Sequence, residues 1–239
     1  MRSYTRHQLK QDSFTTSTAE TISWAVEHRS KLVAAGVVVA VILAALIGGW
    51  AYINYRDQQA SSQLAQAIEK YNAPIRPEGT PASPDLLSYG SAQERAKAAN
   101  AEFTQIASKY PFTQSSAVAH YFAGVTFHDL GDNTSAESDL KQVSDSRYKE
   151  IASLAKVALA SIYHDTNHNS QAIDLYKQLI DHPTVSVGKT TAQFMLGSLY
   201  ESMGEVDEAR HLYEQMQKET PTGMTAQLAG QRLQALAKP

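Results

Sequence analysis

The sequence predicts an all-α protein in which a single N-terminal transmembrane helix precedes an α-solenoid of helix pairs, closed by a C-terminal capping helix. Three observations lead to this fold class. An uncharged apolar run lies near the N-terminus, prolines cluster soon after it, and small and aromatic residues recur every 36 or 37 residues in the remainder. Such an interval holds two helices and their connections, which is typical of helical repeat proteins.

The uncharged run extends from Leu32 to Ile53. A helix rises about 1.5 Å per residue, so a run of this length covers roughly the ~30 Å of a bilayer core. Trp50, Tyr52 and Tyr55 follow at its far end, and amphipathic rings prefer the headgroup level. A cleaved signal peptide normally has an apolar region of only about 7–15 residues after a short lead. We therefore predict a retained anchor over 32–53 that contacts membrane lipid.

The orientation of this anchor follows from its flanks, because basic residues in short segments tend to stay cytoplasmic. Beyond the anchor, Arg56 is the one basic residue before Lys70. The preceding segment 1–31 carries five: Arg2, Arg6, Lys10, Arg29 and Lys31. We predict a cytoplasmic tail over 1–31 and a large C-terminal part on the other side of the membrane.

Two connecting segments come next. Residues 54–72 are predicted to form a juxtamembrane helix, with Leu64, Ala67 and Tyr71 on an approximate 3.6-residue period. Residues 73–90 are predicted to be an extended loop, because proline interrupts a helix. Its prolines are Pro74, Pro77, Pro81 and Pro84. The helical repeat domain then covers 91–239.

The repeat domain shows one small-and-aromatic pattern several times. Its alanines are Ala99, Ala136, Ala172 and Ala209, and four residues after each come Phe103, Leu140, Tyr176 and Tyr213. A second pattern holds Gly124 with Phe127, Ala160 with Tyr163, and Gly197 with Tyr200. Gly131, Asn167 and Gly204 share its register and suit a left-handed residue between two helices. Small residues let paired helices approach closely, while the aromatics fill the gaps to the next pair.

This pattern resembles the tetratricopeptide repeat, in which Leu-Gly, an aromatic, an alanine, a second aromatic and a proline occur in order. Residues 190–223 match best, through Leu196, Gly197, Tyr200, Ala209, Tyr213 and Pro221. Residues 117–150 and 153–186 match less fully. Ala99, Phe103 and Pro111 supply only a second helix, for which 54–72 is the candidate partner. Residues 224–237 are predicted to be the capping helix.

The resemblance also implies a protein-binding groove along a separate face of each first helix. Its predicted lining residues are Val118, Tyr121, Val125, His128, Leu154, Val157, His164, Phe194 and Glu201. The face is mostly apolar and lacks the basic clamp that some relatives use for a terminal carboxylate, so we expect apolar segments as ligands. The alternative is that Tyr121 and Phe194 pack against the loop or the juxtamembrane helix.

Enzyme chemistry finds little support in the residues. Gly188-Lys189-Thr190 ends like a phosphate loop, but Pro183 replaces the glycine it requires. His164 and His168 are separated by the turn residue Asn167, and zinc normally needs three or four ligands. The chain has no cysteine, and its net charge of −3 argues against a nucleic-acid partner. We predict a non-enzymatic protein with no catalytic, cofactor or metal site and no cofactor.

The whole layout resembles the bacterial YfgM-like ancillary subunits of the SecYEG translocon. That resemblance implies a single-pass protein of the bacterial inner membrane with a periplasmic repeat domain. It also implies an interaction scaffold whose partners are the Sec translocon, periplasmic chaperones or exported polypeptides. The alternative is a fixed structural subunit of another cell-envelope complex. A transient scaffold should leave the groove open, whereas a fixed subunit should have it occupied.

Overall fold

The computed structural model describes residues 24, 26–83, 86–219 and 222–237, so most of the predicted tail over 1–31 lies outside the described residues. The described residues form α-helices joined by loops, with one isolated β-bridge. They fall into two compact units, Met1–Asn54 and Tyr55–Pro239. Each unit is described by itself.

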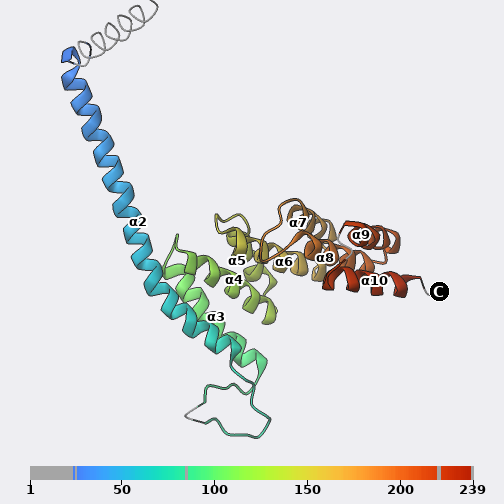
Figure 1. Ribbon diagram of the computed structural model, residues 1–239. Helices are drawn as coiled ribbons and strands as arrows, with labels where there is room; N and C mark the ends of the chain where they lie inside the picture. Colours follow the sequence, from blue (N-terminus) through green and yellow to red (C-terminus); the bar gives the residue numbers. More distant parts are fainter. Residues whose placement is uncertain (1–23, 25, 84–85, 220–221, 238–239) are drawn as a thin grey trace, which may run out of the picture. The chain divides into compact units, whose positions relative to one another are not determined.

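A single long helix, α2 (Arg29–Asn72), begins in the first unit and ends in the second (Figure 1). The sequence divides this stretch into 32–53 and 54–72, but no proline interrupts it and the helix is continuous across the boundary. The apolar part in the first unit exposes its side chains, and the helix is long and apolar enough to cross a membrane. The later part buries Ala60, Leu64 and Ala67 inside the second unit.

The proline-rich loop after α2 is closed at its base. Ile75 and Tyr89 form a parallel β-bridge, in which Arg76 N–H donates to the Tyr89 carbonyl at 2.9 Å. The Arg76 guanidinium also donates to the Ser88 carbonyl at 2.7 Å. These bonds bring the two ends of the loop together beside the start of the next helix.

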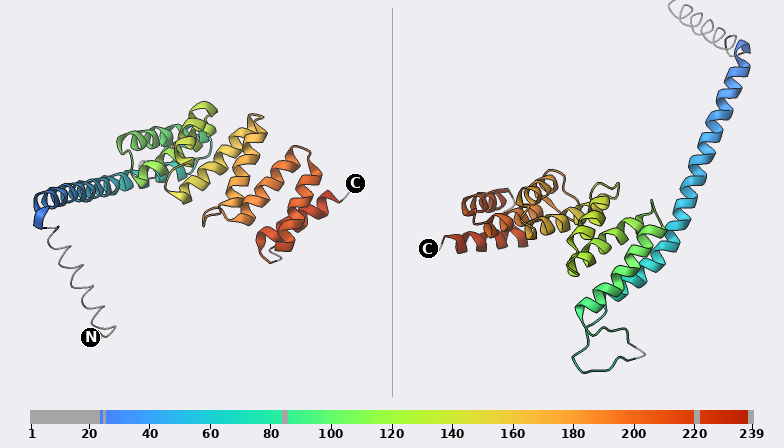
Figure 2. Two further views of the ribbon diagram at one scale, coloured as in Figure 1. Left: turned by 90° about the horizontal axis from the view of Figure 1, so that it is seen from above. Right: turned by 180° about the vertical axis from the view of Figure 1, so that it is seen from behind.

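The rest of the second unit is a row of helices, each packed on the one before it (Figures 1 and 2). In order they are α3 (Ala92–Lys109), α4 (Gln114–Asp129), α5 (Asn133–Ser144), α6 (Lys149–Asp165), α7 (Asn169–Asp181), α8 (Lys189–Ser202), α9 (Val206–Glu219) and α10 (Met224–Leu236). Further contacts join α4 to α6 and α8 to α10. Helices α4/α5, α6/α7 and α8/α9 are the three repeat pairs, and α10 covers the end of the row.

The turn inside each repeat pair has the backbone that the sequence predicts. Gly131, Asn167 and Gly204 have φ of 82°, 61° and 79°, which confirms the left-handed turn residues. In all three the residue after the turn donates its N–H back to the aromatic of the pattern; Asp132 N–H, for example, reaches the Phe127 carbonyl at 2.9 Å. The helix ends are therefore capped in the same way in every repeat.

The small residues of the pattern lie where paired helices touch. A Cβ added at Gly197 would lie 2.5 Å from Cε1 of Tyr213, a fully buried ring, and one at Gly124 would lie 2.5 Å from Cγ of Leu140. Such distances are shorter than any ordinary contact. The close approach predicted for these positions is confirmed.

The first helix pair uses the end of α2. Ala60, Leu64 and Ala67 share one buried cluster with Phe103 and Ile106 of α3. The Ser91 hydroxyl caps α3 by accepting the Glu94 N–H at 3.0 Å, and the Glu94 carboxylate accepts the Gly90 N–H at 2.8 Å. The partner proposed for α3 from the sequence is thus the correct one.

Candidate protein-binding face

The nine predicted lining residues lie on the first helix of each repeat pair, α4, α6 and α8, and each is partly exposed. We call this set the helix face. Its members are Val118, Tyr121, Val125 and His128 on α4, Leu154, Val157 and His164 on α6, and Phe194 and Glu201 on α8. Half-burial at every position leaves part of each side chain available to another molecule.

The apolar members rest on the buried core to different degrees. Tyr121, Leu154 and Val157 pack against the same central cluster, which joins the repeats. The Phe194 ring lies 5.8 Å, centroid to centroid, from the buried Tyr213 ring of its own repeat. Val125 packs against none of the three buried clusters of the described residues. The helix face therefore contains side chains that pack on the core and one, Val125, that packs on none of these clusters.

An aromatic cluster anchors the α4 end of the face. Tyr121 meets Phe122 edge-on at 5.1 Å, and Phe122 lies 5.6 Å from Tyr71 of α2 and 5.1 Å from Phe103 of α3. Burial raises the pKa of the Tyr121 hydroxyl, and Tyr71 adds to this. Tyr121 thus packs on Phe122 and on the central cluster, and Phe122 is the ring that meets Tyr71 in the juxtamembrane part of α2. Phe194 packs inside its own repeat.

The polar members form one row of contacts between successive repeats. His128 Nδ1 lies 2.8 Å from the Asn133 side-chain oxygen, and His164 Nδ1 lies 2.9 Å from the corresponding oxygen of Asn169. The other ring nitrogen reaches the next repeat: His128 Nε2 is 3.4 Å from Asp165 Oδ2, and His164 Nε2 is 3.1 Å from Ser202 Oγ. These histidines therefore link neighbouring repeats.

Glu201 continues this row to the capping helix. Its Oε2 lies 3.8 Å from the Arg232 guanidinium of α10. The pKa of the nearby Tyr213 is raised to about 12, chiefly by burial; the Ser198 hydroxyl at 3.4 Å opposes this rise and Glu201 contributes to it. Glu201 thus lies between the last repeat and its cap.

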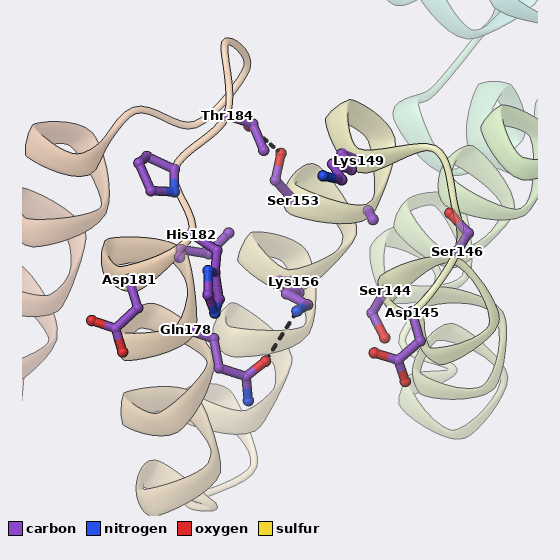
Figure 3. A pocket seen from close by; sticks show the side chains of 13 residues that line it. Ser144, Asp145, Ser146, Lys149, Ser153, Lys156, Gln178, Asp181, His182 and Thr184 are labelled. Atoms are coloured by element: carbon purple, nitrogen blue, oxygen red, sulfur yellow. Dashed lines mark hydrogen bonds between the residues drawn. The ribbon is translucent and has the colours of Figure 1, made fainter. Parts of the chain in front are cut away.

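The cavities described in the second unit are lined by other residues than the helix face. The largest, about 560 Å³, lies where α5 and α7 end and α6 begins (Figure 3). Lys156 donates to Gln178 across it at 3.0 Å, and Ser153 and Thr184 share a hydrogen bond of 2.8 Å. Its side chains point in from three helices, which sequence reasoning did not bring together.

A second cavity, about 500 Å³, occupies the equivalent place one repeat earlier. Gln142 and Val143 line it at positions 36 residues before Gln178 and Leu179 of the larger cavity. Extending the repeat register to every position would have revealed this correspondence. At the third such place Glu219 accepts from Lys189 at 2.7 Å and from Gln193 at 3.4 Å, so a polar cluster bridges α8 and α9 there.

No group of three or more histidine, aspartate or glutamate side chains within the described residues is arranged to hold a metal ion. His168 lies four residues from His164, a spacing that could suit a metal-ligand pair. Its Nδ1 is 3.0 Å from the Thr166 hydroxyl, and its ring meets the Tyr163 ring edge-on.

Fold and face together define an α-solenoid of helix pairs with the tetratricopeptide pattern. Residues 24–238 match the tetratricopeptide repeat-like domain family, and the chain belongs to it. Domains of this kind generally mediate protein–protein interactions and are typically non-catalytic.

One solved structure supports the fold. A crystal structure of nearly identical TPR-like repeats of a putative kinesin light chain from Podospora anserina aligns with a TM-score of 0.54 and 16% identity, over 75% of this chain and 85% of that chain. A crystal structure of MamA aligns with a TM-score of 0.43 and 23% identity, over 62% and 90%. No curated protein matches the sequence.

Proposed function

We propose that this protein is a membrane-anchored interaction scaffold of the bacterial inner membrane, with its N-terminus cytoplasmic and its repeat domain periplasmic. In this proposal the helix face holds apolar segments of exported polypeptides and assists the Sec translocon or periplasmic chaperones in handling them. The observation that carries it is the row of half-buried apolar side chains on α4, α6 and α8, offered by a family that generally binds proteins.

The membrane part of the proposal rests on α2. Its uncharged run of 32–53 exposes large apolar side chains such as Val37, Val41 and Leu46, which would face water in the absence of lipid. Trp50, Tyr52 and Tyr55 are exposed at the end of the run, as interfacial aromatics would be. The excess of basic residues before the run favours a cytoplasmic N-terminus.

A fixed structural subunit of a cell-envelope complex is the second candidate, and the packing of Phe194 favours it. Because that ring contacts the buried Tyr213, part of the helix face already serves the core. A helix face that also supports the core could bind a permanent partner subunit as well as a transient ligand.

Site-specific photo-crosslinking in living cells distinguishes the two. A photoreactive amino acid replaces Val125 of the helix face or Ser161, an exposed residue of α6 that follows Val157 by four residues on the same side of the helix. The matched control replaces Ser138, an exposed serine of α5. The scaffold proposal expects many exported polypeptides crosslinked from Val125 and Ser161, fewer when export is blocked, and none of these from Ser138. Products are identified by mass spectrometry.

One invariant product that persists when export stops would favour the fixed subunit instead. Identical crosslinked products from Ser138 and Ser161 would contradict specific binding at the helix face.

A further inference from the structure

The loop between α3 and α4 presents an aromatic side chain to the outside. Phe112 is 79% exposed, although Tyr110, two residues before it, and Thr113, directly after it, are almost fully buried. Its φ is 68°, a left-handed backbone that is uncommon for a bulky residue. Together with Asn167 it forms the pair of non-glycine residues with positive φ in the described chain. The loop backbone therefore directs the Phe112 side chain away from the buried residues that surround it in the sequence.

Bonds from two directions hold the backbone of this loop. Arg147 and the Tyr148 hydroxyl, from the next connection, donate to the Phe112 carbonyl at 3.1 and 3.3 Å. The Thr113 hydroxyl accepts the Ser116 N–H at 3.0 Å and so caps α4. The exposed position of Phe112 is therefore built into the fold.

The same loop is bonded to α2 just after its apolar run. The Arg56 guanidinium donates to the Lys109 carbonyl and lies over the Tyr110 ring at 4.9 Å. Asp57 accepts the Ser115 N–H at 2.9 Å. Asp57 is four residues past Ile53 in one continuous helix, which is at most about 6 Å of helix rise, and tilt only reduces it.

That height is comparable to the headgroup layer, roughly 5–8 Å on each side of the hydrocarbon core. Trp50, Tyr52 and Tyr55 independently mark the same level as interfacial. If 32–53 spans the membrane, Arg56 and Asp57 lie within a few residues of its end, and chain connection alone keeps them close to the headgroups.

The charges around Phe112 suit a lipid surface. Lys109 and Arg147 are exposed beside it. Two of the acidic residues in these connections already accept hydrogen bonds: Asp57 from the Ser115 N–H, and Glu150 from the Ser186 N–H at 2.7 Å. A third, Asp145, is exposed. An aromatic ring with flanking cations is the combination that inserts among headgroups, especially anionic ones.

We infer that Phe112, flanked by Lys109 and Arg147, is a second membrane contact that holds the first repeats against the bilayer at the end of the span. This inference rests on the proposed span over 32–53. The inference adds that the repeat domain itself contacts lipid, through the Phe112 side chain.

The test uses the full chain in vesicles of phosphatidylcholine and phosphatidylglycerol at low protein density. The chain has no cysteine, so Gln114→Cys, two residues from Phe112 and exposed, carries a single fluorescent label. The matched control is Asn167→Cys, an exposed turn residue with the same left-handed backbone. Lipids with a nitroxide at the headgroup quench a label that lies at the membrane.

Quenching of the Gln114 label should exceed that of the Asn167 label by about twofold or more, fall toward the control with Phe112→Ser, and return with Phe112→Trp. Tryptophan fluorescence of the chain with Trp24→Phe and Phe112 unchanged, quenched by brominated lipid chains, reports the span separately, since Trp50 is then its single tryptophan and lies near the end of the span.

Tryptophan quenching without an excess at Gln114 would overturn the contact and leave the span in place. Loss of both signals would overturn span and contact together. A Gln114 label shielded from aqueous iodide but not quenched by nitroxide lipid would show that protein, such as a second copy, covers Phe112, and would also overturn the inference.

Discussion

At the residue scale, single polar side chains hold helices together where packing alone does not. Glu219, at the end of α9, accepts from Lys189, Gln193 and Gln215, and so joins the start of α8 to its own helix. Lys189 is the largest of the causes that lower the pKa of this carboxyl to about 2. The contact is exposed, so solvent weakens it.

This cluster predicts a pH dependence. A lowered pKa means that the folded state favours the ionised carboxylate, so its stabilisation is present above the ordinary value near 4.5 and is lost as pH falls toward about 2. Glu219→Gln should therefore lower the melting temperature slightly at neutral pH and not at pH near 2. Thermal melts followed by circular dichroism at several pH values measure this difference.

The control for Glu219 is Glu208→Gln, which removes an exposed carboxylate of the same helix. Equal, pH-independent shifts for the two variants would mean that the Lys189 contact contributes nothing specific.

Phe194 is one residue of the helix face whose truncation should affect folding. Its ring is half-buried against Tyr213, so Phe194→Ala should cost about 1–3 kcal/mol of unfolding free energy, less than a fully buried phenylalanine. Val185→Ala, which truncates a side chain that is 96% exposed, should be silent. Chemical denaturation measures both, and an unchanged midpoint for Phe194→Ala would place its ring outside the core.

At the element scale, stability depends on how closely paired helices approach. Gly197 of α8 faces the Tyr213 ring of α9 at a distance that leaves no room for a methyl group. The equivalent positions one repeat earlier hold Ala160 and Tyr176. Repeats with the same pattern thus differ in the size of the small residue at this position.

Gly197→Ala should destabilise the fold by about 1–3 kcal/mol, because the buried Tyr213 ring must move. Gly230→Ala is the matched control, since its new methyl would meet only Nε2 of Gln217, the end of an exposed side chain. That change should be neutral or stabilising, because alanine favours a helix over glycine by about 1 kcal/mol. Melting temperatures that fall equally for both would contradict the tight α8–α9 contact.

At the scale of the whole molecule, the proposed span predicts which parts of the chain an added protease can reach. The uncharged run and its flanks predict a cytoplasmic tail and a periplasmic repeat domain. Protease added to spheroplasts should then digest the chain beyond Tyr55 and spare an N-terminal tag. Lysed spheroplasts are the control, in which the tag should be lost as well, and a protected repeat domain in intact ones would reverse the orientation.

The sequence by itself determined the features that depend on a few neighbouring residues. Gly131, Asn167 and Gly204 were predicted as left-handed turns because glycine and asparagine tolerate that backbone. The small residues at Gly124 and Gly197 were recognised because the repeat places them at the same step each time. The helical class and the repeat family follow from this local periodicity.

The tertiary structure alone decided the contacts between segments that are distant in the sequence. The link from His128 to Asp165, the packing of Phe194 on Tyr213 and the clamp of Arg147 on the Phe112 carbonyl each join different helices or loops. Periodicity assigns a residue to a helix face, but the partner it meets depends on the spacing and rotation of helices packed together. That geometry is set by all the side chains between them at once, so no single stretch of sequence contains it.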